Sequence, residues 1–192
     1  FGIDDVKING SVTSLTPPVL VIADNSSQIS AANVPQGSVN HVLSTFQTTV
    51  SAAWATVTAA SFTTSGNYQA SDILASGLKL WYNSINNFST ATQVGAGFTS
   101  AATGLGETIS FSSLNQSLPI GTGYFWLTTS LTDSAIPGRT IMLNAISSSN
   151  ITLSFGSKSG SAIAAGTQTI TIVVPNTPTS LTKGCTTNTS QV

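Results

Sequence analysis

Runs of alternating apolar and polar residues near the middle of the chain predict paired β-strands. Residues 54–64 and 78–82 are rich in β-branched, aromatic and aliphatic side chains, and a polar segment with turn residues joins them. Successive side chains of a strand point to opposite faces, so the second run places Leu80 on one face and Lys79 and Trp81 on the other. We therefore expect a half-buried strand that carries an aromatic side chain on its outer face.

Similar runs along the chain predict about nine or ten strands in all. They cover residues 19–22, 39–50, 107–111, 124–131, 139–146, 151–155 and 170–174, and none has the i, i+3, i+4 spacing of a surface helix. The pattern predicts an all-β fold, an antiparallel β-sandwich of immunoglobulin-like or jelly-roll type over residues 18–174. Val57 and Phe62 are out of phase for one regular strand, which predicts a β-bulge near Ala59 and Ala60.

The two ends of the chain differ from this central module. Residues 1–17 are predicted to form an extended N-terminal arm whose weakly apolar edge consists of Val6, Ile8, Gly10 and Val12. Residues 175–192 are a polar C-terminal tail that contains Cys185, the only cysteine, so a disulfide within the chain is impossible. Whether Cys185 is an idle surface thiol or links two chains stays open. Phe1 in place of an initiator Met, and the abundance of Ser, Thr and Asn, lead us to expect a mature secreted protein of the cell surface.

The composition excludes several classes of partner. Charged residues make up 6% of the chain, whereas about 25% is usual in soluble proteins. The five basic residues are spread along the sequence and the net charge is −1, so we expect no contact with nucleic acid. No apolar run approaches the ~20 residues of a membrane-spanning helix, so we expect no membrane insertion.

Catalytic and metal-binding patterns are scarce. His41 is the only histidine and lies within a predicted strand, which gives a zinc site little support. The six carboxylates are scattered, without the nearby pair that a glycosidase uses, and no G-x-S-x-G motif occurs. We expect no enzyme, no metal and no cofactor. Calcium at Asp4–Asp5 or Asp24–Asn25 stays open as an alternative, and Asp72 is expected to cap a turn.

Three aromatic residues carry the main alternative, which is carbohydrate binding. Trp81, Tyr124 and Trp126 can stand on outer sheet faces, where flat rings stack on sugars. The usual burial of Trp favours the alternative, in which they pack in a second layer or under loops. Acceptor sequences of the form N-x-[ST] also occur, as weak indications of glycans, at Asn9, Asn25, Asn87, Asn115, Asn150 and Asn188.

Several ordered motifs resemble a known module. They are Ser61–Ile73, Leu78–Tyr82, Asn87–Thr90, Gly121–Leu127, Ser157–Gly160 and Gly166–Ile170. Over residues 20–174 this set resembles a β-sandwich module of secreted surface proteins of Bacteroidetes, the domain found beside BNR-type sialidase repeats. The resemblance implies a non-catalytic accessory domain exported to the cell surface, and it marks Asp133–Ala135 as similar to the O-glycan acceptor motif of that group, with Ser134 as the acceptor.

Low charge leads to a prediction about assembly. A sheet that does not close has edges, and natural monomers protect those edges with Lys, Pro or inward-pointing charges. Five basic residues cannot protect every edge of a large sandwich, and residues 1–17 can add to a neighbour's edge as an extra strand. We therefore predict a self-assembling extracellular filament or adhesin subunit, with a carbohydrate-binding accessory module as the alternative. In the simpler interpretation, the arm pairs with the sheet of its own chain.

Overall fold

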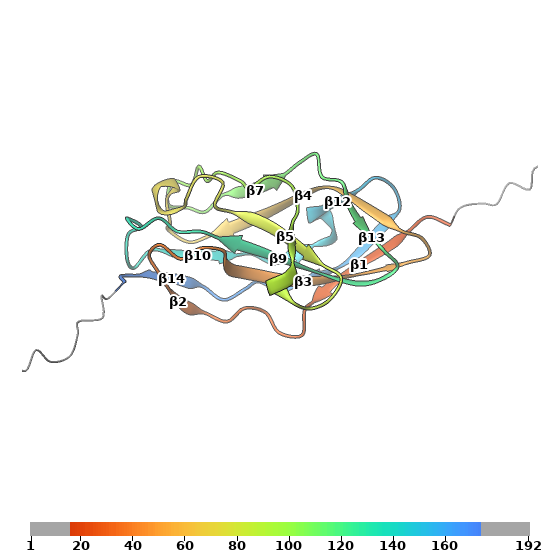
Figure 1. The fold of residues 1–192 in the computed structure, drawn as a ribbon, viewed down its shortest axis with the longest axis horizontal. Helices are drawn as coiled ribbons and strands as arrows, with labels where there is room; N and C mark the ends of the chain where they lie inside the picture. Colours follow the sequence, from red (N-terminus) through yellow and green to blue (C-terminus); the bar gives the residue numbers. More distant parts are fainter. Residues whose placement is uncertain (1–15, 174–192) are drawn as a thin grey trace, which may run out of the picture.

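Strands dominate the structure. The computed structural model describes residues 16–173, which form fourteen β-strands and three 3-10 helices (Figure 1). The prediction of an all-β fold is confirmed, while the strand count exceeds the expected nine or ten. The described strands run from Val19 to Thr171. The arm residues Val6, Ile8, Gly10 and Val12 lie outside the described residues, as does Cys185.

The first sheet has seven strands in the order β11-β13-β1-β3-β9-β5-β6. Its strands are β11 (Ile146–Ser147), β13 (Ser157–Ala162), β1 (Val19–Asp24), β3 (His41–Ser51), β9 (Gly121–Thr129), β5 (Lys79–Asn83) and β6 (Thr92–Gln93). The long strands β3 and β9 form its centre and pair antiparallel over their whole length.

The second sheet also has seven strands and is organised around β4. Its strands are β12 (Ile151–Leu153), β4 (Ala55–Ser65), β10 (Thr140–Leu143), β14 (Gln168–Thr171), β2 (Ala32–Pro35), β7 (Thr108–Phe111) and β8 (Gln116–Leu118). β10 and β12 pair with one side of β4, and β7 and β8 pair with it as well. Three 3-10 helices lie in the connections: η1 (Ala70–Asp72), η2 (Phe88–Thr90) and η3 (Ser148–Asn150).

Both sheets are mixed, which corrects the prediction of a purely antiparallel sandwich. β1 runs parallel to β13, and β2 runs parallel to β14. Parallel neighbours need a long crossover connection, and here the whole chain between the first and last strands supplies it. The immunoglobulin-like or jelly-roll type stays a prediction.

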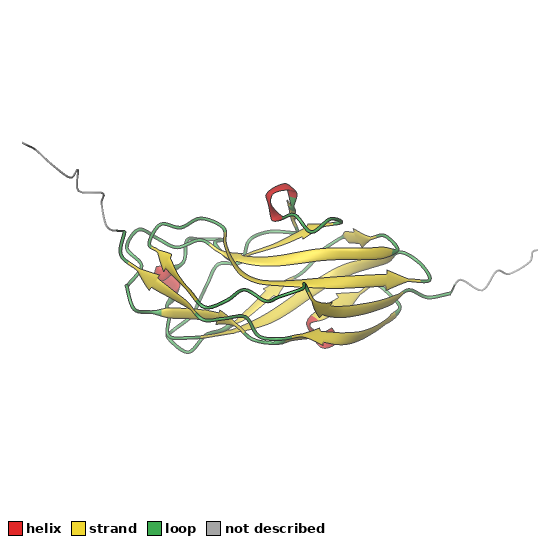
Figure 2. Ribbon diagram, turned by 90° about the horizontal axis from the view of Figure 1, so that it is seen from below, coloured by secondary structure: helices red, strands yellow, loops and turns green. Residues whose placement is uncertain are grey.

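The sheets pack as two layers around one cluster of buried apolar side chains (Figure 2). Phe46 and Phe125 of the first sheet stack at 5.1 Å between ring centroids, and Phe62 of the second sheet lies 5.9 Å from Phe46. The pairing of β12 with β4 shifts by one residue opposite Thr58. This bulge confirms the predicted break in alternation next to Ala59.

The molecule is elongated, and the chain enters and leaves it at opposite ends (Figures 1 and 2). At the entry end, Val19 pairs with both Ser51 and Ser157. At the exit end, the last strand pairs with Pro35 through Thr171. We use the names entry end and exit end for these two tips of the sandwich below.

Candidate functional site

β7 is an open edge of the second sheet. It pairs with β4 on one side, and no strand within residues 16–173 pairs with its other side. The Thr64 N–H donates to the Glu107 carbonyl at 2.9 Å. Because hydrogen-bonded and non-bonded pairs alternate in an antiparallel ladder, Thr108 and Ser110 direct their backbone groups away from β4. Their side chains are exposed, while Ile109 points into the core. β7 therefore offers backbone donors and acceptors to an incoming strand.

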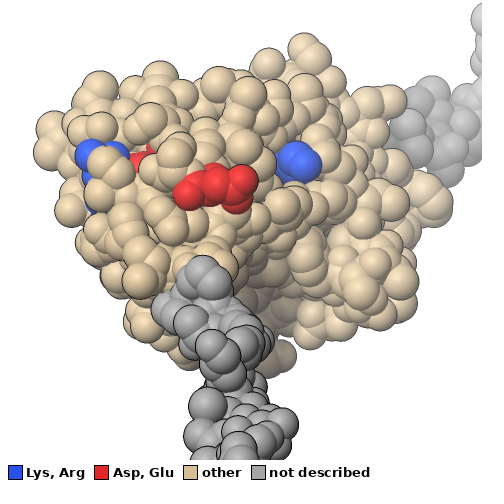
Figure 3. All heavy atoms as spheres, turned by 60° about the vertical axis from the view of Figure 1, so that its left-hand side comes forward, with Lys and Arg blue, Asp and Glu red and all other residues tan. Residues whose placement is uncertain are grey.

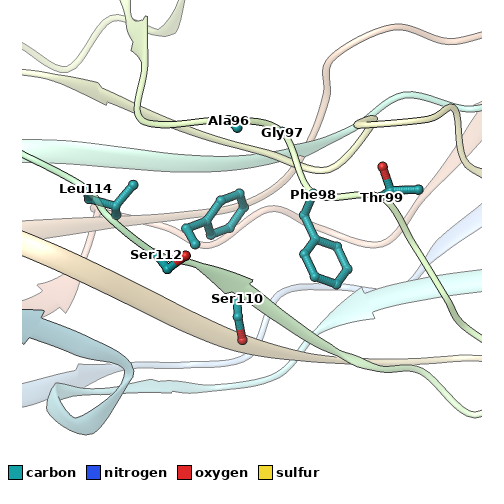
Figure 4. A pocket seen from close by; sticks show the side chains of 8 residues that line it. Ala96, Gly97, Phe98, Thr99, Ser110, Ser112 and Leu114 are labelled. Carbon is teal, nitrogen blue, oxygen red and sulfur yellow. The ribbon is translucent and has the colours of Figure 1, made fainter.

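A groove of about 250 Å³ runs beside this edge. Residues 96–99, which border the first sheet, line one side of it, and residues 110–114 line the other. Figure 4 shows Phe98, Ser110 and Leu114 around the groove. Phe111 is buried in its wall, Phe98 is partly buried, and none of the lining residues carries a charge. The lining combines apolar side chains with the polar groups of Thr99, Ser110 and Ser112, so an incoming strand would meet both kinds of surface here.

The other described edges are shorter or carry protective residues. β6 and β11 have two residues each, and β2 ends in Pro35, which has no N–H to donate. β13 carries Lys158, whose ammonium group donates to the Ile151 carbonyl, and Gly160 with a positive φ of 82° interrupts its regularity. β8 is followed at once by Pro119. β12, the remaining edge strand of the second sheet, has three residues, and its Ile151 carbonyl accepts from Lys158. β7 has four residues and carries neither Pro nor Lys, so it is the less protected edge in this comparison.

The predicted sugar-binding aromatics lie together on the outer face of the first sheet. Trp81 of β5 pairs with Trp126 of β9, while Phe125 and its inward neighbours join the core. Phe88 of η2 covers this face: its ring lies 5.6 Å from that of Trp81 and 5.8 Å from that of Trp126. Trp126 is only 5% exposed as a result. Trp81 and Tyr124 are half-buried, so they alone of the three offer ring surface to a ligand.

Polar side chains hold the loop that carries Phe88 in place. The Asn25 amide donates to Thr45 Oγ1 and to Asn86 Oδ1, both at 2.9 Å, and the Asn86 amide donates back to Asn25 at 2.9 Å. The Trp81 indole N–H donates to Thr128 Oγ1 at 2.9 Å. These bonds fix the aromatic cluster as a rigid outer layer.

Some of the predicted glycan acceptors have side chains engaged in hydrogen bonds within the protein, and others are exposed. The Asn25 amide is buried and occupied, and the Asn150 amide donates to the Ser61 carbonyl at 2.6 Å. Asn87 and Asn115 are exposed, and so is Ser134, the acceptor that the resemblance marks. Asn9 and Asn188 lie outside the described residues.

Two hydrogen-bond networks hold the carboxyl groups of Asp72, which is buried, and Glu107, which is half-buried, near the exit end. Asp72 accepts from the Gln69 N–H at 2.8 Å, which confirms that it caps a turn, and it also forms an ion pair with Arg139 at 2.9 Å. Glu107 accepts from the hydroxyl of Tyr68 at 3.0 Å. Burial, together with the Glu107 carboxylate, raises the pKa of Tyr68 above its ordinary value, and burial raises the pKa of Tyr82. Both networks connect one loop to another and leave no carboxylate facing a cleft.

The candidate metal residues have protein partners. His41 Nε2 lies 3.0 Å from Gln168 Oε1, and Asp24 accepts from the Ile163 N–H at 2.8 Å. Within residues 16–173, no three His, Cys, Asp or Glu side chains gather where they could hold a metal ion. The other calcium candidates, Asp4 and Asp5, lie outside the described residues.

The family models and the curated proteins provide no relative for this chain. No known family model matches the chain, and no curated protein matches it. The resemblance to the surface module of Bacteroidetes therefore stays a prediction. In the described part of the chain, no helix has the length and apolar character needed to cross a membrane.

Proposed function

We propose that this protein is an extracellular structural subunit that assembles with copies of itself into a filament or adhesive layer. The arm of residues 1–17 of one copy adds as a strand to the second sheet of the next copy. The observation that carries this proposal is the unprotected edge of β7, with the uncharged groove beside it. Main-chain bonds of this kind supply affinity, and apolar side chains set the register.

The directions of the strands support this arrangement. β4 runs from the entry end to the exit end, and the antiparallel β7 therefore starts near the exit end and runs inward. The arm precedes β1, which starts at the entry end. When the entry end of one copy faces the exit end of the next, the arm meets β7 near its first residue. It then lies antiparallel to β7.

The length and pattern of the arm suit this edge. Residues 1–15 precede the first described residue, and about 3.3 Å per extended residue gives a reach of about 50 Å. Paired residues of neighbouring strands point to the same face. Ile109 and Phe111 point inward, so the alternating apolar residues of the arm, among them Ile8, would face the same core. Ser110 would then pair with Asn9 or Ser11 on the outer face.

A cross-linking experiment tests the proposal. In a Cys185→Ser background, Ser110→Cys protein is mixed with Ser11→Cys or Asn9→Cys protein, and disulfide dimers are counted on gels after mild oxidation. Because each protein carries one cysteine, a cross-link between the two different proteins can only join separate chains. Asn33→Cys on the β2 edge is the matched control. Electron microscopy of the wild-type protein shows whether filaments form.

We expect filaments, together with mixed dimers at Ser110 and none above background at Asn33. Filaments with dimers only at Asn33 would show that the arm adds to β2, and they would overturn the proposed addition to β7. A wild-type protein that stays monomeric at millimolar concentration would overturn self-assembly itself. A disulfide that forms readily within one chain carrying both Ser110→Cys and Ser11→Cys, without any between chains, would mean that the arm pairs with its own sheet.

Carbohydrate binding is the second candidate, and the outer face of the first sheet favours it. Trp81 and Tyr124 keep part of their rings accessible there, and the half-buried side chain of Gln47 lies at the strand position paired with Tyr124. The Asn83 amide, on the other side of Tyr124, already donates to the Asn87 carbonyl and to Thr90 Oγ1. Rings beside amide groups are a suitable combination for sugar hydroxyls and C–H faces. The cover that Phe88 places over Trp126 makes this surface smaller than the sequence indicates.

A further inference from the structure

The entry end exposes large apolar side chains. Trp54 is 64% exposed, and Ile120 and Phe155 are 56% exposed each. Trp54 precedes β4, contrary to its predicted place within the strand. Ala55 pairs with Leu118, and the Ser154 N–H donates to the Thr56 carbonyl, so all three apolar side chains belong to turns at the same end. Large apolar groups left in water on adjacent turns indicate a contact surface.

The exit end has a matching set. Leu105 is 88% exposed and lies just before β7, and Val39 is 65% exposed just before β3. Ile136 and Ile172 are also exposed there. The loops that carry them are joined to the exit ends of the strands: the Gln36 N–H donates to the Thr171 carbonyl, and the Leu131 N–H donates to the Ser38 carbonyl. Apolar side chains are therefore exposed at both tips of the elongated sandwich.

Charge does not oppose a contact between the two ends. The entry-end turns, residues 52–54, 119–120 and 154–156, contain no charged residue. At the exit end, Asp72 is paired with Arg139, and Glu107 accepts hydrogen bonds from Tyr68 and Ser100. Asp133 is exposed in the loop whose Thr132 carbonyl accepts from the Gly37 N–H, so one carboxylate of the exit end faces solvent beside these apolar side chains. Figure 3, turned toward the exit end, shows a surface that is mostly uncharged. Desolvating these two surfaces costs little, because few ions lose their water.

We propose that the entry end of one copy packs directly on the exit end of the next, with Trp54 at the centre of the contact. This inference rests on the proposed self-assembly and adds a second interface, which does not depend on the arm. The two surfaces differ, so the contact is head-to-tail and does not close on itself as a two-fold dimer would. Repetition of such a contact produces an open filament. A few residues dominate the energy of a protein interface, and Trp is enriched among them.

A pair of matched variants tests this contact in the full chain. Trp54→Asp places a charge in the proposed interface, and Ile85→Asp places one on an equally apolar side chain, 59% exposed, in the loop between β5 and η2. The readout is the concentration at which half of the protein sediments as polymer. Loss of a central Trp contact corresponds to about a 100-fold rise in that concentration. Ile85→Asp should change it by less than about threefold.

A mixing experiment tests the head-to-tail geometry. Leu105→Asp disables the exit end and leaves the entry end intact, whereas Trp54→Asp does the reverse. Each variant alone should therefore fail to form end-to-end chains. In a mixture, the intact exit end of the Trp54→Asp protein can bind the intact entry end of the Leu105→Asp protein, so we expect 1:1 pairs that grow no further through this contact.

The outcomes separate this contact from the proposed function. Polymer formation by Trp54→Asp at the wild-type concentration would overturn the end-to-end contact, while arm cross-links at Ser110 would still support the proposed function. A lower urea midpoint of unassembled Trp54→Asp protein, relative to Ile85→Asp protein, would place Trp54 against its own chain and would also overturn the contact. A wild-type protein that never assembles would overturn the proposed function and this contact together.

Discussion

The ion pair between Asp72 and Arg139 should be the strongest single polar contribution to the stability of the exit end. The Asp72 side chain is 1% exposed and that of Arg139 is 18% exposed. The carboxylate accepts two bonds from Arg139 Nη1, at 2.9 and 3.2 Å, and one from the Ile136 N–H at 2.9 Å, besides the bond from Gln69. It therefore joins η1 to the loop that precedes β10.

The size of the effect follows from these contacts. Asp72→Ala leaves the guanidinium of Arg139 largely buried without its anion and removes the acceptor of two backbone N–H groups, which should cost about 3–5 kcal/mol. Arg139→Ala leaves a buried carboxylate that keeps its two backbone donors, so the cost should be smaller, about 2–3 kcal/mol. The double variant should be less destabilised than the sum of the two by about 2 kcal/mol.

Urea unfolding at pH 7, followed by tryptophan fluorescence, measures the four free energies of this cycle. Asp133→Asn is the control, because Asp133 is exposed and should contribute less than about 0.5 kcal/mol. A coupling energy below about 0.5 kcal/mol would put the pair in the class of surface ion pairs and refute the reasoning from burial. Equal losses for Asp72→Ala and Asp133→Asn would refute it as well.

Three further predictions concern the core and the outer face. Among residues 16–173, the hydroxyl of Thr129 is the one buried side-chain polar atom without a hydrogen-bond partner, so Thr129→Val should stabilise the protein by about 1 kcal/mol. Thr128→Val should destabilise it by a similar amount, because the Trp81 indole loses its acceptor. Urea unfolding measures both changes in the free energy of unfolding. Because the pKa of Tyr68 is raised in the folded state, the unfolded state loses its proton first, and stability should fall as pH rises above about 10. In Tyr68→Phe protein, the urea midpoint should fall less steeply as pH rises above about 10. A pH dependence equal to that of the wild-type protein would argue against Tyr68 as the cause. Trp81→Ala should abolish binding on a glycan array if the outer face binds sugars, while Ile85→Ala should not; retained binding would dismiss that surface.

Local pattern predicted the elements whose side chains alternate between core and solvent. The bulge in β4 was predictable because Val57 and Phe62 are both large and both have to be buried. The bulge in β3, where the pairing shifts between Val42 and Ser44, was not, because apolar residues on both sides of it hide the change of phase. Short edge strands such as β2 (Ala-Asn-Val-Pro) and β8 (Gln-Ser-Leu) were missed because each has a single large apolar residue, and their pairing is set by neighbouring strands.

The candidate sites needed the order of the strands. Nothing in the sequence of Thr108–Phe111 distinguishes an edge strand from a central one. In both positions, the side chains of a half-buried strand alternate between the core and the solvent. Likewise, Arg139 is distant in sequence from Asp72, and only the fold brings the two charges together. The aromatics lie on an outer face, and Trp126 is packed under a loop, as the usual burial of Trp favours. The cover of Phe88 over Trp126 depends on a loop held by Asn25, which the sequence pattern does not show.

The two proposed contacts would strengthen one another because they act between the same two copies. An arm bound to β7 holds the entry end of its own copy near the exit end of the next, so the second contact forms as an intramolecular event at a high effective concentration. Each contact can then be weak alone while the pair is strong. This arrangement suits a chain with so few charges, because two strong, fully apolar surfaces would also bind wrong partners. Removal of either contact should therefore leave only the weak affinity of the other, and assembly should then require a much higher protein concentration.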